Sequence, residues 1–258
     1  MSKPVSCIPG FESLLRRRDL PSICRYEDVQ NPPSDSSNGS LREQDRTCLT
    51  WLDCQPSKSV IYVSFGSLTI LTREQLLEFW YGLVNSEKLF LLVIREGLIP
   101  EEDNKLVETP LDLLVGTRDR GCIVGWAPQE EVLTHRAVGG FLTHSGWNST
   151  LESILAGVPM ICWPQIADQQ VNSRCVGELW KVGVDMKDIC DRLTVEKMVR
   201  NLMDGKREKI MKSIAENSRM ACDSVRDGGS SYCNLEKLIE DIRSMKSTKN
   251  ASVKVLKA

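Results

Sequence analysis

Hydrogen-bonding side chains gather after two short apolar runs in the middle of the chain. The runs are Phe141–Thr143 and Val158–Cys162, and both have the length and composition of buried strands. The polar and aromatic residues that follow them are His144, Trp147, Asn148, Ser149, Glu152, Asp168 and Gln169. Ligands bind beyond the carboxyl ends of strands in an open parallel sheet, so this placement predicts a ligand site.

The segment after the first run has the composition of an anion site. Gly146 allows a tight turn and a close approach of the backbone to a ligand. Asn148 or Ser149 begins the predicted next helix, whose free N–H groups favour negative charge. His144 and the Ser149 hydroxyl add hydrogen-bond donors for a phosphate. Ser67, which follows another predicted strand, could supply a further phosphate contact.

Other residue types around this segment fit the remaining parts of a nucleotide sugar. Glu152 lies one helical turn from Asn148 and suits paired ribose hydroxyls. Trp126 precedes a Pro–Gln turn that could leave one indole face open to a planar base. The pair Asp168 and Gln169 suits adjacent sugar hydroxyls. Each feature has an ordinary alternative when taken alone: a capping box for Glu152, core packing for Trp126, and a plain first helical turn for Asp168.

The elements that must position these residues follow a regular alternation. A capping box at Thr72–Gln75 precedes a predicted helix, and further helices are predicted between the other strands. The predicted strands are 58–65, 88–95, 121–126, 139–144, 158–164 and 181–186. Strands alternating with helices predict an α/β fold, a doubly wound, Rossmann-like parallel sheet, with helices continuing to about residue 245.

Composition and the absence of certain motifs count against several classes of ligand and cofactor. With 33 basic and 35 acidic residues among 258, the net charge of -2 gives no electrostatic case for nucleic acid or an anionic membrane. No apolar run reaches the roughly 20 residues of a transmembrane helix. The ten cysteines form no CxxC pair and no metal-binding cluster with histidine, which favours a reducing, cytoplasmic location and no metal. The lack of GxGxxG and of a Walker-type lysine counts against nicotinamide cofactors and ATP.

Residues 126–169, WAPQEEVLTHRAVGGFLTHSGWNSTLESILAGVPMICWPQIADQ, resemble the plant secondary-product glycosyltransferase (PSPG) signature over its full length. The flanking stretches CLTWLDCQPSKSVIYVSFGSL and GGSSYCNLEKLIED are similar to the same group, the plant family 1 UDP-glycosyltransferases. The resemblance implies a GT-B fold, in which the C-terminal Rossmann-like domain binds a UDP-sugar and the N-terminal domain binds the acceptor. Ser145 stands where the family usually has Cys.

The resemblance also implies a role for each matching residue. Trp126 would stack on uracil with help from Ala127 and Gln129, and Glu152 would hold the ribose. The diphosphate contacts would be Ser67, His144, Asn148 and Ser149, at the turn made by Gly146. Trp147, Asp168 and Gln169 would hold the sugar, and the terminal Gln is associated with glucose. UDP-glucose would be the donor substrate with no separate cofactor, and the acceptor would be a small terpenoid, iridoid or phenolic molecule.

The general base of the family has no counterpart among the histidines of this chain. That base is a histidine of the N-terminal domain, whereas His135 and His144 both lie inside the donor signature. Residues 1–47 are predicted to be an irregular, shortened remnant of the acceptor domain with a linker, 48–245 the donor domain, and 246–258 a flexible tail. Two hypotheses stay open: an inverting UDP-glucosyltransferase to which this chain supplies the donor site, and a non-catalytic UDP-sugar-binding module. A purely structural protein would not need these site residues together.

Overall fold

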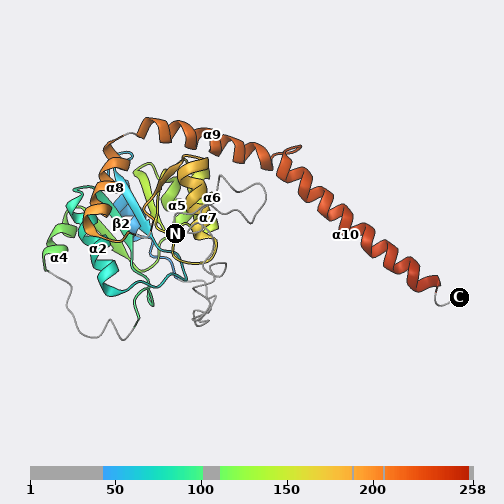
Figure 1. Ribbon diagram of the computed structural model, residues 1–258, viewed down its shortest axis with the longest axis horizontal. Coiled ribbons are helices and arrows are strands. Elements are labelled where there is room, and N and C mark those ends of the chain that lie inside the picture. The colour runs from blue at the N-terminus through green and yellow to red at the C-terminus, as the bar shows by residue number, and fades with distance from the viewer. Residues whose placement is uncertain (1–42, 101–110, 188, 206, 256–258) are drawn as a thin grey trace, which may run out of the picture.

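The computed structural model describes residues 43–100, 111–187, 189–205 and 207–255. Its centre is a parallel, six-stranded sheet with the strand order β3-β2-β1-β4-β5-β6 (Figure 1). The strands are β1 (Val60–Ser64), β2 (Leu89–Val93), β3 (Gly121–Val124), β4 (Val138–Thr143), β5 (Met160–Cys162) and β6 (Gly183–Asp185). The predicted doubly wound fold is therefore confirmed, and its strand order reverses direction between β1 and β4.

Helices cover both faces of the sheet. They are α1 (Thr47–Asp53), α2 (Arg73–Asn85), α4 (Leu111–Arg118), α5 (Gln129–Thr134), α6 (Trp147–Leu155), α7 (Gln169–Arg174), α8 (Arg192–Asp204), α9 (Arg207–Val225) and α10 (Ser230–Val255). A π-helical turn, Cys175–Leu179, extends α7. Successive side chains of a strand point to opposite faces. Val60 and Tyr62 of β1 accordingly pack with α1, α5 and α6, while Ile61 and Val63 pack with α2 and α8.

The start of α2 shows how local sequence sets an element boundary. The Thr72 hydroxyl accepts a hydrogen bond from the backbone N–H of Gln75 at 3.2 Å. The Gln75 side chain in turn accepts one from the backbone N–H of Thr72 at 2.9 Å. This reciprocal pair is the capping box predicted from the sequence, and it satisfies two N–H groups that a helix start leaves without partners.

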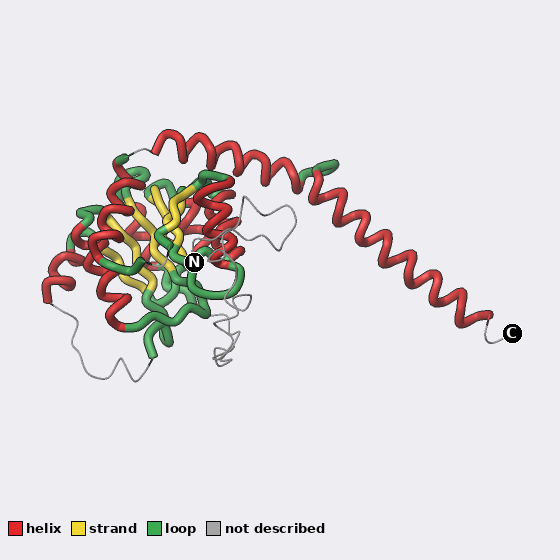
Figure 2. Tube along the Cα trace, viewed as in Figure 1, coloured by secondary structure: helices red, strands yellow, loops and turns green. Residues whose placement is uncertain are grey.

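The last helix leaves the body of the protein. α10 follows α9 and projects away from the sheet and its covering helices (Figures 1 and 2). It continues to Val255, whereas the sequence predicted that the helices end at about residue 245. No Gly or Pro interrupts the sequence from Ser230 to Val255, and nothing in its composition therefore ends the helix earlier.

The segment that precedes α1 is tied to the β3–α5 loop. The backbone N–H of Asp45 donates to the Trp126 carbonyl at 2.8 Å, and the Arg46 guanidinium pairs with Glu131 at 2.6 Å. The predicted remnant of an acceptor domain, residues 1–47, lies mostly outside the described residues. None of the helices in the described ranges is both long and apolar enough to cross a bilayer.

Candidate functional site

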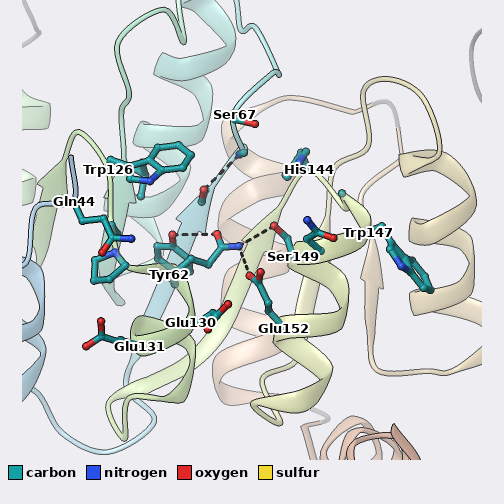
Figure 3. Close-up of a pocket in the computed structure, with 18 of the residues that line it drawn as sticks. Gln44, Tyr62, Ser67, Trp126, Glu130, Glu131, His144, Trp147, Ser149 and Glu152 are labelled. Atoms are coloured by element: carbon teal, nitrogen blue, oxygen red, sulfur yellow. Dashed lines mark hydrogen bonds between the residues drawn. The ribbon is translucent and has the colours of Figure 1, made fainter. Parts of the chain in front are cut away.

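A cavity of about 670 Å³ opens where the strand order reverses, beyond the carboxyl ends of β1 and β4. Parallel strands all end at the same edge of the sheet, so loops far apart in sequence meet there. All of the predicted site residues except Gln169 line this cavity (Figure 3). They are Ser67, Trp126, Ala127, Gln129, His144, Gly146, Trp147, Asn148, Ser149, Glu152 and Asp168.

The N-terminus of α6 forms one wall of the cavity. Gly146 is the residue before the helix, and no side chain caps it. The first intrahelical hydrogen bond runs from the Thr150 N–H to the Gly146 carbonyl at 2.9 Å. The N–H groups of the first turn therefore have no carbonyl partner within the helix, and they carry the positive end of its dipole. An anion in the cavity would be bound by these groups.

The imidazole of His144 fits between two glycines from different loops. A Cβ at Gly66 would lie 2.4 Å from the ring, and one at Gly146 would lie 2.5 Å from it. Gly66 also has a φ of +71°, in the left-handed region that glycine adopts most readily. Both positions must therefore lack a side chain for the β1 and β4 loops to close around the ring.

His144 is neutral at physiological pH. Burial lowers the pKa of His144 to about 4, although the nearby Asp168 charge acts in the opposite direction. The positive charge of Arg95 lowers this pKa further, and a hydrogen bond to the Ser64 backbone raises it. A neutral imidazole offers one N–H and one lone pair, so His144 can take part in a hydrogen bond to a ligand without contributing a charge.

Arg95 binds the backbone of the β1–α2 loop but does not itself line the cavity. Its guanidinium is buried and donates to the Gly66 carbonyl at 2.8 Å, and also to the Thr69 carbonyl. These bonds fix the backbone on both sides of Ser67, which lines the cavity. A guanidinium with its several fixed donors suits this bridging of carbonyls.

A hydrogen-bonded cluster occupies the floor of the cavity. The amide nitrogen of Gln129 donates to the Ser149 hydroxyl at 2.9 Å and to a Glu152 carboxylate oxygen at 2.6 Å. The amide oxygen of Gln129 accepts from the Tyr62 hydroxyl at 3.3 Å. The tertiary structure thus joins residues of β1, α5 and α6 that are far apart along the chain. One wall beside this cluster is formed by Trp126, whose partly buried indole also packs against the core.

Of the two neighbouring residues predicted to bind a sugar, Asp168 and Gln169, only Asp168 lines the cavity. Asp168 lines the cavity and accepts a hydrogen bond from Asn172 at 2.8 Å. The same Asn172 amide donates to the Ser145 carbonyl at 3.0 Å, which ties the β5–α7 and β4–α6 loops together. Gln169 is buried and does not line the cavity, and its amide oxygen accepts from the backbone N–H groups of Gln165 and Ile166.

Trp147 also lies at the edge of the site rather than at its centre. Its indole is 46% exposed and packs against Trp180, with ring centroids 6.4 Å apart. Figure 3 shows this indole turned away from the hydrogen-bonded cluster of Gln129 and Glu152. The backbone of Trp147 belongs to the first turn of α6, and this part of the residue would face an anion bound at the helix end.

Several cavity residues were not predicted from the sequence. They are Gln44, Tyr62, Ser64, Val93, Pro128, Glu130 and Glu131. Three of them, Tyr62, Ser64 and Val93, belong to strands, and their sequence context predicts core residues. Only the fold shows that they lie near the carboxyl ends of the strands, where the cavity is. Gln44 comes from the segment before α1, whose position no local pattern indicates.

The second histidine belongs to a structural contact. One ring nitrogen of His135 lies 3.1 Å from the Asp53 carboxylate, and the other accepts from the Ala137 N–H at 3.2 Å. His135 therefore joins the end of α5 to α1. Across the described ranges, no group of three acidic, histidine or cysteine side chains could hold a metal ion.

Comparison with protein families gives one match over most of the chain. A family model described as "UDP-glucoronosyl and UDP-glucosyl transferase" matches residues 36–220. Two curated relatives are the 7-deoxyloganetic acid glucosyltransferase of Catharanthus roseus and the myricetin 3-O-rhamnoside 1,2-glucosyltransferase of Crocosmia x crocosmiiflora. The first is 46% identical over 301 residues, covering 93% of this chain and 62% of the relative. The second is 52% identical over 218 residues, covering 84% of this chain and 45% of the relative.

Solved structures give the same result for the fold. The crystal structure of Os79 from O. sativa in complex with UDP has a TM-score of 0.71 at 37% identity, covering 86% of this chain and 49% of that one. The Phytolacca americana UGT2 complexed with UDP-2fluoro-glucose and pterostilbene has a TM-score of 0.67 at 36% identity, covering 81% and 47%. This chain therefore spans about half of each matched structure, and 62% or 45% of the two curated relatives.

Proposed function

Because the chain belongs to the UDP-glucoronosyl and UDP-glucosyl transferase family, we propose that its cavity binds the UDP-sugar donor of a glycosyl transfer. The observation that carries this proposal is the meeting of four features in one cavity: the uncapped start of α6, the neutral His144, the Glu152 carboxylate and the indole of Trp126. These features complement a diphosphate, a ribose and a planar base.

The residues are assigned along the length of the ligand. Trp126 stacks on uracil, with the Ala127 backbone and Gln129 beside it, and Glu152 accepts hydrogen bonds from the ribose hydroxyls. The diphosphate lies against the first turn of α6 and the β1 loop, where its contacts are Ser67, His144, Gly146, Asn148 and Ser149. The sugar lies toward Trp147, Asp168 and Gln169, with the Gln169 amide nitrogen as its donor.

In the proposed reaction, an acceptor oxygen attacks the anomeric carbon of the donor sugar from the face opposite to UDP. The new carbon–oxygen bond forms as the bond to the diphosphate breaks, and UDP leaves with the electron pair. The N–H groups of α6 and the neutral donors around them stabilise the negative charge that develops on the diphosphate. The acceptor proton passes to a base, and in this family that base belongs to the acceptor domain.

We propose glucose as the donor sugar and a small terpenoid, iridoid or phenolic hydroxyl or carboxyl as the acceptor. Relatives are named as glucosyltransferases of 7-deoxyloganetic acid and of (R)-mandelonitrile, and solved structures hold a trichothecene or pterostilbene. These names support the class of acceptor. The cytoplasmic location inferred from the cysteine pattern stays a prediction.

The second candidate is a UDP-sugar-binding module without transferase activity. The whole sequence holds two histidines, of which His135 bridges α5 to α1 and His144 stands at the proposed diphosphate end. The alignment to the Catharanthus relative runs over 301 residues, more than the 258 of this chain, so part of that relative has no counterpart here. Both observations fit a chain that carries the donor site without the base.

Titration calorimetry on the full chain tests the proposed site directly. UDP and UDP-glucose should bind, and ADP should bind at least tenfold more weakly because the stacking face and the Gln129 edge are matched to uracil. Equal affinity for ADP and UDP, or no binding of either, would refute the assignment. Incubation with UDP-glucose and a panel of phenolic and terpenoid alcohols, followed by mass spectrometry, then separates a transferase from a binding module.

A further inference from the structure

Tyr62 places a polar group in the middle of the cavity floor. Its side chain is 1% exposed, and it leaves strand β1 on the face that packs with α5 and α6. The ring stacks on Phe141 with centroids 4.9 Å apart and an angle of 17° between the planes. A phenylalanine would satisfy this packing equally well. The hydroxyl is therefore the part of Tyr62 whose burial must be explained by its partners.

Those partners form a chain of hydrogen bonds from strand β1 to α6. The Tyr62 hydroxyl donates to the amide oxygen of Gln129 at 3.3 Å. The Gln129 amide nitrogen then donates to Glu152 at 2.6 Å (Figure 3). Each group donates toward α6, an arrangement in which neighbouring hydrogen bonds strengthen one another.

This direction determines which way the Gln129 amide faces. An amide can present either its oxygen or its NH₂ group to a neighbour. The Tyr62 hydroxyl occupies the oxygen, so the NH₂ group is turned toward Ser149 and Glu152. With the opposite orientation, the amide oxygen would face a carboxylate and repel it. The bond from Gln129 engages one carboxylate oxygen of Glu152, and the other oxygen can accept from a ligand.

We propose that Tyr62 is a positioning residue that acts through Gln129 to hold the Glu152 carboxylate in place for the hydroxyls of the nucleotide ribose. The inference rests on the proposed function of the cavity. Tyr62 itself lies beneath Gln129 and contributes its one buried hydroxyl. Pocket geometry at the ribose end therefore depends on a strand residue that the signature segment, residues 126–169, does not include.

The test removes the hydroxyl oxygen of Tyr62 and compares the binding of two ligands, one with ribose hydroxyls and one without. Tyr62→Phe keeps the ring that stacks on Phe141, so the variant should fold. We expect UDP to bind about three- to tenfold more weakly, the effect of one lost hydrogen bond. Binding of 2′,3′-dideoxy-UDP, which has no ribose hydroxyls, should change by less than about twofold. Tyr232→Phe on the exposed α10 is the matched control, and its affinity for both ligands should equal that of the wild type.

A double-mutant cycle tests whether the effect passes through Gln129. In the Gln129→Ala background, Tyr62→Phe should cause less than about a twofold further loss of UDP affinity, because the connecting amide is gone. Independent losses in the two variants would overturn the proposal, as would an equal loss for UDP and its dideoxy analogue, or no loss. Failure of the wild type to bind UDP would instead overturn the proposed function, and this inference with it.

Discussion

Acidification should destabilise this protein through one histidine. The folded-state pKa of His144 is about 4, below the ordinary value near 6.5 that applies in the unfolded chain. As the pH falls, the unfolded state therefore takes up the proton first. The stabilising contribution of the neutral ring is complete above about pH 6.5 and is lost progressively as the pH falls toward 4.

The size of the effect follows from the displacement of the pKa. Each pKa unit corresponds to about 1.4 kcal/mol, so the loss between pH 7 and pH 5 is about 2 kcal/mol, and about 3 kcal/mol at pH 4. One edge of the ring opens to the cavity, which makes these values upper limits. UDP must be left out of the measurement, because its negative charge would raise the pKa of the ring.

The assay is urea unfolding at pH 7 and at pH 5, followed by circular dichroism. His144→Gln should lose about 2 kcal/mol less than the wild type between these two conditions. Ser218→Ala is the control because it changes no titratable group, and it should lose as much stability as the wild type. Carboxylates whose pKa is lowered by hydrogen bonds, such as Glu78 and Asp191, titrate equally in all three proteins and cancel. If His144→Gln and the wild type lose the same stability, the ring is not buried between the two loops and the reasoning is refuted.

Three further substitutions probe other parts of the site. Trp126→Ala should weaken UDP binding by about 1–3 kcal/mol, measured by calorimetry, because a stacking face is lost. Gly66→Ala should weaken UDP binding at least tenfold and lower the free energy of unfolding by about 1–2 kcal/mol. Its new Cβ would meet the His144 ring at 2.4 Å in a left-handed backbone conformation. Asn172→Ala should lower the free energy of unfolding in urea by about 1–3 kcal/mol, because it leaves the buried Ser145 carbonyl without its donor.

For each of these three predictions, one experimental result would contradict it. A folded Trp126→Ala protein with unchanged UDP affinity would remove the indole from the site. Wild-type affinity in Gly66→Ala would show that the β1 loop can move without disturbing the diphosphate end. Unchanged stability in Asn172→Ala would mean that the two loops it joins are held by other contacts. Ser218→Ala, which removes the hydrogen bond from the half-buried Ser218 of α9 to the Leu155 carbonyl of α6, is a suitable control for loss of a hydrogen bond outside the site.

The resemblance to a glycosyltransferase signature was confirmed by the family match, and the alternation of apolar runs correctly predicted the sheet. The capping box at Thr72 and Gln75 was also predicted correctly, because it depends on residues three positions apart. The end of α10, in contrast, was not predicted correctly. No residue in that stretch ends a helix, yet its polar composition resembled a frayed tail, and the structure continues it to Val255.

The sequence by itself determined the residues that can bind a ligand, since hydrogen-bonding and aromatic types stand where predicted strands end. It also predicted a helix start next to these residues, although α6 begins at Trp147, one or two residues earlier than predicted. These features depend on neighbours within a few positions along the chain.

Only the tertiary structure decided how these residues act on one another. Parallel strands bring β1 and β4 side by side although they are far apart in sequence, and this enclosed His144 between Gly66 and Gly146. The fold also put the Tyr62 hydroxyl beneath Gln129, a residue that is far from it along the chain. Burial and long-range hydrogen bonds set the pKa of a histidine and the direction of an amide, and neither can be read from residue type or spacing.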